Sequence, residues 1–207
     1  MEDEMLRIYD EQGNPLGEAT REEVHKLGHW HKTFHCWLIS REEGIDYIYF
    51  QKRSSSKKDY PNLLDITAAG HILSHETVDD GIREVKEELG IDLSMEELIP
   101  LGVIKYSVSQ GELIDKELAH NFLLDYKLGM NDFKPQKEEV SGIVKAQFTH
   151  FSDLYLNGVS EIKVVGFEIN EEGENIQINK YVTKSEFVAH EHSYYEEVIK
   201  LIDSYIK

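Results

Sequence analysis

Three glutamates with helical spacing are the residues of this 207-residue chain best suited to chemistry. Glu84, Glu87 and Glu88 share one side of a helix predicted over residues 77–89, at about 100° per residue. Asp80 falls on the same side. Like charges at these spacings repel one another and weaken an isolated helix. Clustered oxygen donors are, however, what a hard cation such as Mg²⁺ or Mn²⁺ binds, especially when substrate phosphates share the cation.

The opposite side of the same segment is apolar and would face a protein core. Its stripe consists of Val78, Ile82, Val85 and Leu89. Arg83 stands four residues before Glu87, so we expect its guanidinium to form a bidentate pair with that carboxylate. Gly90 is well suited to end the helix. The alternative interpretation is an ordinary solvated helix face, because runs of charge are common on helix surfaces.

The residues before the helix extend the pattern. Gly70 is followed by five residues and Glu76, and then by Arg83-Glu84-x-x-Glu87-Glu88-x-Gly90. This arrangement resembles the signature box of the Nudix hydrolases. The box usually has seven residues between its first glutamate and its arginine, whereas this chain has six, and His75 stands where glycine is usual. The role of Glu76 is therefore left open.

The Nudix resemblance implies a fold and a reaction. The implied fold is α/β, a Nudix-type α/β/α sandwich with a mixed β-sheet. The implied reaction is metal-dependent hydrolysis of a pyrophosphate bond in a nucleoside diphosphate derivative or a similar diphosphate. The cofactor would be Mg²⁺ (or Mn²⁺), in a site formed by Glu84, Glu87, Glu88 and Gly70. By the same resemblance Glu138 or Glu139 would act on the attacking water, and we select Glu139 for the catalytic set, with Glu84 and Glu88 as alternatives for this role.

A basic loop, Arg53-Ser-Ser-Ser-Lys57-Lys58, stands out in an acidic chain. With the nearby histidines, it makes about residues 5–150 resemble the Nudix branch similar to type I isopentenyl diphosphate isomerase. In that enzyme the matching loop holds the substrate diphosphate. The resemblance therefore implies that Arg53, Lys57 and Lys58 bind a diphosphate here, with His71 as a further substrate contact. The alternative is that the lysines only make the surface more soluble.

The same resemblance extends to the metal site of the isomerase, which is built from histidines and glutamates. The matching positions are His31, His71 and Glu117, with Asp115 in place of a glutamate and His25 one residue out of register. These histidines could equally be ordinary hydrogen-bonded side chains, as could His29 and His35. The isomerase also needs a cysteine where this chain has Ala69, and alanine has no proton to exchange. An isomerase-like enzyme is thus an alternative function, and a non-catalytic Nudix-fold nucleotide-binding protein is another.

The composition restricts the partners. The net charge is −18, from 40 acidic and 22 basic residues, which argues against binding nucleic acid polymers or anionic membranes. The expected partner is a small-molecule diphosphate, and a homodimer is left open. No apolar run approaches roughly 18 residues, and the acidic N-terminus lacks the apolar core of a signal peptide. With Cys36 as the single cysteine, we expect a soluble, cytoplasmic protein in which this residue is buried.

Length and patterning predict one domain over residues 1–207. The resemblance implies that it is a Nudix domain with a core of about residues 30–160, preceded by a strand and helix and followed by a helical extension. A capping box at Thr20 opens a short helix that Gly28 closes. Strands are expected over 6–9, 33–40 and 47–53 (a hairpin), 63–69, 101–108, 116–126 and, as the last strand, 142–149. Further helices are expected from Phe151 and over residues 191–206. Residues 158–179 receive no assignment.

Overall fold

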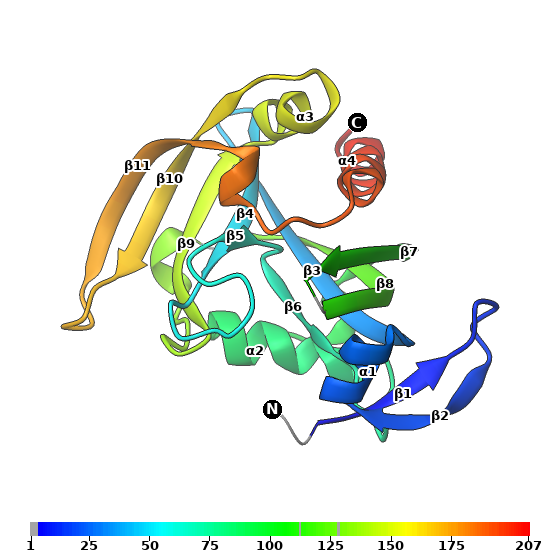
Figure 1. Ribbon diagram of the computed structural model, residues 1–207. Coiled ribbons are helices and arrows are strands. Elements are labelled where there is room, and N and C mark those ends of the chain that lie inside the picture. Colours follow the sequence, from blue (N-terminus) through cyan, green and yellow to red (C-terminus); the bar gives the residue numbers. More distant parts are fainter. Residues whose placement is uncertain (1–3, 112, 128) are drawn as a thin grey trace.

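The computed structural model describes residues 4–111, 113–127 and 129–207. Residues 1–3, part of the N-terminus used above to argue against a signal peptide, lie outside this range. A central sheet carries helices on both faces (Figure 1). In chain order the first elements are β1 (Met5–Tyr9), β2 (Pro15–Thr20), α1 (Arg21–Leu27), β3 (Trp30–Glu42), β4 (Ile45–Arg53), β5 (Leu64–Asp65), β6 (Ala68–His71) and α2 (Arg83–Leu89). They are followed by β7 (Ile99–Gln110), β8 (Leu113–Asp125), β9 (Val140–Gln147), α3 (Phe148–Leu156), β10 (Glu161–Ile169), β11 (Asn175–Thr183) and α4 (His192–Ile206).

Strand β3 is the centre of the sheet. It pairs in parallel with β8 over Trp30–Ile39. Its antiparallel partners are β1, β6 over Thr33–Cys36, and β4 over Ile39–Glu42. The sheet continues from β4 through β9, β10 and β11, while β7 pairs with β8. Parallel and antiparallel pairs coexist, so the predicted mixed sheet is confirmed.

The alternation of side chains along β3 divides the core into two layers. Phe34, Cys36 and Leu38 pack with Val85 and Leu89 of α2 on one face. On the other face Trp37 and Ile39 pack with α3 and α4, the latter contributing Tyr194, Tyr195, Val198, Ile199 and Ile202. The predicted α/β/α sandwich is therefore confirmed. Cys36 is fully buried, and burial raises the pKa of its thiol, as expected of a core residue.

Several local predictions are also confirmed. Thr20 and Glu23 form the predicted capping box at the start of α1, and Gly28 ends this helix with φ 68°. This conformation favours glycine because a Cβ would clash with the backbone. The hairpin of β3 and β4 has the predicted antiparallel pairing.

The segment between the hairpin and α2 differs from the prediction. Residues 63–69 do not form one strand, because β3 and β4 pair only near their shared turn and then diverge. Consequently β5 pairs with β4, and β6 pairs with β3. The helix predicted over 77–89 is also shorter, since Asp79–Ile82 form a 3₁₀ turn and α2 begins at Arg83. Asp80 was predicted on the same helix side as the three glutamates. Because it lies in the 3₁₀ turn instead, its carboxylate accepts a hydrogen bond from the Thr77 N–H at 2.8 Å.

The unassigned tract forms a hairpin, and β9 is not the last strand. β10 and β11 pair along their whole length, and β10 joins the sheet beside β9. Most side chains of β11 face solvent, so the apolar alternation that signals a half-buried strand is weak there. In Figure 1 this hairpin extends away from the helices.

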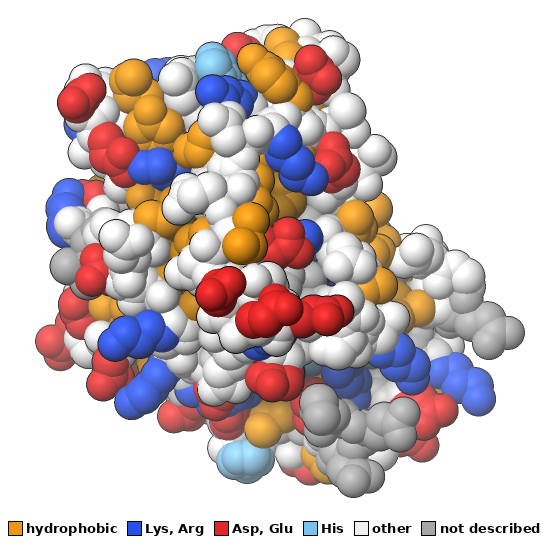
Figure 2. Space-filling model, turned by 90° about the vertical axis from the view of Figure 1, so that its left-hand side faces the viewer, with side chains coloured by type: hydrophobic (Ala, Val, Ile, Leu, Met, Phe, Trp, Pro, Cys, Tyr) orange, Lys and Arg blue, Asp and Glu red, His pale blue; other side chains and the backbone are white. Residues whose placement is uncertain are grey.

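The surface reflects the composition. In Figure 2, acidic side chains gather across the middle of the displayed face, with lysines and arginines scattered around them. None of the helices in the described ranges is long and apolar enough to span a lipid bilayer.

Candidate functional site

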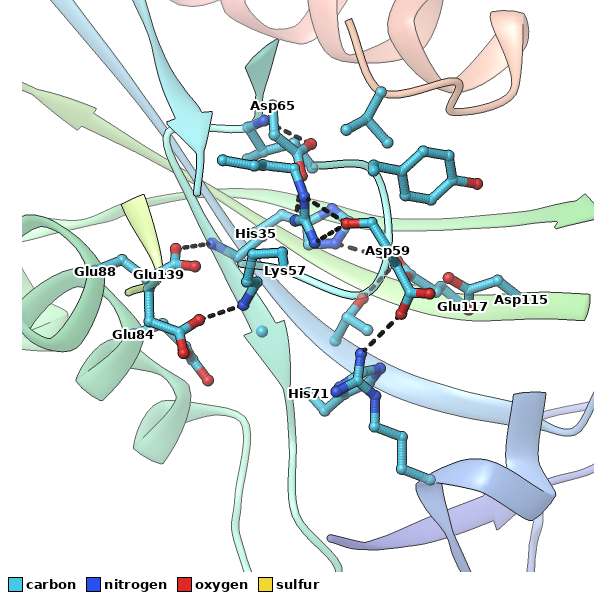
Figure 3. A pocket seen from close by; sticks show the side chains of 18 of the residues that line it. His35, Lys57, Asp59, Asp65, His71, Glu84, Glu88, Asp115, Glu117 and Glu139 are labelled. Carbon is cyan, nitrogen blue, oxygen red and sulfur yellow. Dashed lines mark hydrogen bonds and ion pairs between the residues drawn. The ribbon is translucent and has the colours of Figure 1, made fainter. Parts of the chain in front are cut away.

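A cavity of about 780 Å³ lies beside β5 and β6 and collects two groups of titratable side chains. The carboxylate cluster consists of Glu84, Glu87, Glu88 and Glu139. The histidine cluster consists of His25, His31, His71, Asp115 and Glu117. In Figure 3, Glu84, Glu88 and Glu139 lie on the α2 side of this space, and Asp115 and Glu117 lie on the β8 side. All of these residues except His31 line the cavity itself, and His31 lies directly behind its wall.

Glu88 occupies the space that opens where β3 and β4 diverge. Its Oε2 accepts hydrogen bonds from the side-chain amide of Gln51 at 2.8 Å and from the backbone N–H of Ala69 at 2.9 Å. Burial, reinforced by the nearby charge of Glu84, raises the pKa of Glu88 to about 8. A bound cation would favour the ionised form of this group.

The position of the Glu84 carboxylate depends on the absence of a side chain at Gly70. Burial raises the pKa of Glu84 to about 7, although the Arg83 charge opposes this effect. A Cβ on Gly70 would lie 2.0 Å from Oε1 of Glu84. Since no heavy atoms approach this closely without bonding, only glycine leaves room for the carboxylate in this position.

Arg83 does not form the predicted bidentate pair with Glu87. Its Nε and Nη2 instead bind the two carboxylate oxygens of Glu76 at 2.7 and 3.1 Å, and it also contacts Glu84. Only one contact, at 3.3 Å, reaches Glu87, whose side chain is 52% exposed. Glu76 also accepts the Leu73 N–H at 2.9 Å. Glu76, whose role the sequence left open, therefore anchors the arginine to the loop before α2.

The basic loop contributes two of its three predicted cations to the cavity. Lys57 forms an ion pair with Glu139, and both residues line the cavity. Arg53 also lines it and donates to Asp65 at 2.9 Å and to the Asp59 carbonyl. Lys58 is exposed and is not among the lining residues.

The histidine cluster has the donor set and the unsatisfied atoms of a metal site. Within the described residues, two groups have ligand atoms that all lie within 4.8 Å of one another. They are His25/His31/His71 and His31/Asp115/Glu117. Buried Nε2 atoms of His25 and His31 and Oδ1 of Asp115 find no hydrogen-bond partner among the described atoms. Such orphaned polar atoms are costly unless a ligand satisfies them.

The protonation of these histidines also fits metal binding. Burial lowers the pKa of His25 to about 4 and lowers the pKa of His31 and His71 as well. Nδ1 of His31 lies 3.1 Å from the His29 carbonyl, so its proton belongs there and the lone pair of Nε2 faces the cluster. Neutral imidazoles with carboxylates suit Mn²⁺ or Zn²⁺, whereas the all-oxygen carboxylate cluster suits Mg²⁺ or Mn²⁺.

A buried polar network that sequence reasoning missed lines the inner wall. Tyr106 donates to Glu117 at 2.7 Å and contacts His190, and His190 contacts Asp65 at 2.9 Å. His35, expected to be an ordinary hydrogen-bonded histidine, lies 3.1 Å from Glu117. Asp65 and His190 are 125 positions apart, so no local spacing could have indicated their contact.

Comparisons with known proteins agree with this architecture. No family model matched the chain. An uncharacterised Nudix hydrolase of Clostridium acetobutylicum is 40% identical over 206 residues, covering 99% of this chain and all of that protein. An isopentenyl-diphosphate Delta-isomerase of Paenarthrobacter aurescens is 34% identical over 98 residues, covering 46% of this chain and 52% of that enzyme. The crystal structure of a MutT/nudix family protein from Enterococcus faecalis matches 84% of this chain and 61% of its own, with a TM-score of 0.53 and 13% identity.

Proposed function

Because the chain belongs to the Nudix hydrolase superfamily, we propose that it is a metal-dependent pyrophosphohydrolase. Its substrate would be a nucleoside diphosphate derivative or a similar small-molecule diphosphate. The observation that carries this proposal is one cavity lined by the three box glutamates, two cations of the basic loop and the further carboxylate of Glu139. Neither a nucleic acid polymer nor a membrane surface is expected as a partner of so acidic a chain. We expect it to act in the cytoplasm.

Glu84, Glu87 and Glu88, with Gly70 beside them, would hold Mg²⁺ or Mn²⁺. When bound, such a cation neutralises diphosphate oxygens and lowers the pKa of an attacking water. The fit is supported by the position of Glu84 and Glu88: burial raises the pKa of both carboxyl groups, and a bound cation would favour their ionised forms. The histidine cluster is a second candidate centre in the same cavity.

The remaining residues supply binding and proton transfer. Arg53 and Lys57 place positive charge where a diphosphate would lie. His71, the member of the histidine cluster that we assign to the substrate, lines the same cavity and would be a further substrate contact. Glu139 is the carboxylate proposed to orient or deprotonate water, and its ion pair with Lys57 fixes its position.

The first prediction concerns turnover. We expect Mg²⁺-dependent release of phosphate or a nucleoside monophosphate in a screen of nucleoside triphosphates, nucleotide sugars, dinucleotides and prenyl diphosphates. Glu87→Gln and Glu88→Gln should each lower kcat/KM by about 100-fold or more. Glu172→Gln, an exposed change in the turn between β10 and β11, should leave it unchanged.

The same screen separates the alternative functions. Incorporation of deuterium from heavy water into a prenyl diphosphate would indicate an isomerase-like enzyme, although Ala69 has no exchangeable side-chain proton. Nucleotide binding without turnover across the whole panel would indicate a binding protein. Either result would contradict the proposed hydrolysis.

A further inference from the structure

His190 comes from the short segment between β11 and α4, and its side chain lines the cavity. This segment is firmly attached, because the Val188 N–H donates to the Leu64 carbonyl at 2.8 Å and Tyr195 donates to the Val188 carbonyl at 2.9 Å. Nε2 of His190 lies 2.9 Å from Oδ1 of Asp65, and Nδ1 lies 3.0 Å from the Tyr106 hydroxyl. One ring therefore bridges β5 and β7.

The partners of this ring determine its protonation. Tyr106 donates its single proton to Glu117 at 2.7 Å, so its oxygen is left to accept from His190. Asp65 is ionised: burial opposes this state, but the hydrogen bond and charge of His190 and the charge of Arg53 lower the pKa of Asp65 to about 2. Both ring nitrogens of His190 then face acceptors, Oδ1 of Asp65 and the Tyr106 oxygen, and an imidazolium is the form of the ring that donates to both. Among the described residues, the titratable groups around the ring are Asp65, Tyr106, His35, Glu117, Tyr194 and Tyr195.

Asp65 is thus shared between two cations. Its Oδ2 binds Nη1 of Arg53, while Oδ1 binds His190 and the Ile66 N–H. The hydrogen bonds to Asp65 and to the Asp59 carbonyl use three of the five N–H groups of Arg53, which leaves two for a ligand. An arginine paired with Asp65 alone would have its charge cancelled, whereas the triad of Arg53, Asp65 and His190 retains a net charge of one.

We propose that His190 is a positioning residue for the diphosphate: it shares Asp65 with Arg53 and so keeps the Arg53 charge available at the cavity wall. The inference rests on the proposed function, because it assumes that a diphosphate enters this cavity. In Figure 3, Asp65 lies away from Glu84 and Glu88, so the triad would bind the part of the ligand remote from the carboxylate cluster. The segment before α4 thereby contributes to binding as well as to the fold.

The test measures binding without turnover. The probe is methylenediphosphonate, a diphosphate that cannot be hydrolysed, titrated with Mg²⁺ into the full chain by calorimetry. His190→Gln should weaken binding about tenfold. His192→Gln is the matched control, since His192 is more than half exposed and pairs with Glu196 away from the cavity. In turnover assays His190→Gln should raise KM with little effect on kcat, as expected of a residue that acts on binding.

Two further measurements distinguish the effect of the His190 charge from a structural effect of replacing this side chain. His190→Lys restores a cation beside Asp65 and should recover most of the lost affinity. A long-range ¹⁵N–¹H spectrum of the wild-type protein at neutral pH should show both ring nitrogens of His190 protonated, and His190→Gln identifies this signal by removing it. Equal binding by wild type and His190→Gln, no recovery with lysine, or a neutral ring would overturn the inference. A wild type that binds the probe but hydrolyses nothing would refute the proposed function alone.

Discussion

Glu88, which is buried, and Glu84, which is half-buried, make the metal-free protein sensitive to pH. The pKa of Glu88, raised by burial to about 8, lies above the ordinary carboxyl value of 4.5. The folded state therefore keeps a proton that the unfolded chain releases between these values. The contribution to stability is fully present below about pH 4.5 and is lost as the pH rises through about 8.

We therefore expect the free energy of unfolding in EDTA to fall between pH 6 and pH 8, by up to about 1.4 kcal/mol per pH unit for one such group. Glu88→Gln should reduce this fall and be more stable than wild type at pH 8, because it removes a charge that would be buried. Urea unfolding monitored by circular dichroism measures both effects. Glu87→Gln, on the exposed side of the same helix, serves as the control. A variant at position 88 that is less stable than wild type at pH 8 would contradict the explanation.

Sequence reasoning was most successful for residues that one helix brings together. Glu84, Glu87 and Glu88 were selected by spacing, and the structure places them at one cavity. It was wrong about Arg83, because sequence spacing favoured Glu87 whereas the loop before α2 brings Glu76 closer. It missed Asp65, Tyr106 and His190, since their contacts are set by the packing of distant strands.

At the scale of elements, the divergence of β3 and β4 determines the site. A continuous ladder between these strands would leave no space for Glu88, nor for the Ala69 N–H that binds it. The chain crosses this gap as β5 and β6, which carry Asp65, Gly70 and His71 to the cavity. The sequence indicated a strand at 63–69, but its division between two partners depends on the twist of the sheet, which local propensity does not encode.

The β10–β11 hairpin provides a prediction at the same scale. A Cβ on Gly166 would lie 2.0 Å from the Ile143 carbonyl oxygen and 2.7 Å from the Val144 Cα, both backbone atoms of β9. Gly166→Ala should therefore push β10 away from β9 and destabilise the protein by about 2 kcal/mol or more. Thermal and urea unfolding measure the loss. Lys163→Ala, an exposed change on the same strand, should have little effect. Equal stability of the two variants would show that β10 is not held against β9 as described.

At the scale of the whole molecule, charge sets how stability responds to salt. An excess of 18 negative charges repels itself in the compact state, and added ions screen this repulsion. We expect the thermal midpoint of the metal-free protein to rise by several degrees between low salt and roughly 0.3 M NaCl. Scanning calorimetry with EDTA present measures the shift, and sucrose at matched osmolality controls for solute effects that do not involve charge. A midpoint that falls with NaCl would mean that local ion pairs outweigh the overall repulsion.

The attachment of Val188 and His190 to β5 also has a consequence during translation. A nascent chain that has already produced the box glutamates still lacks the imidazole beside Asp65, and the inner wall stays open to solvent until residue 190 has emerged from the ribosome. If His190 has the proposed role, diphosphate binding with full affinity would begin only after synthesis has passed α4, and an unfinished polypeptide would bind a diphosphate about tenfold more weakly.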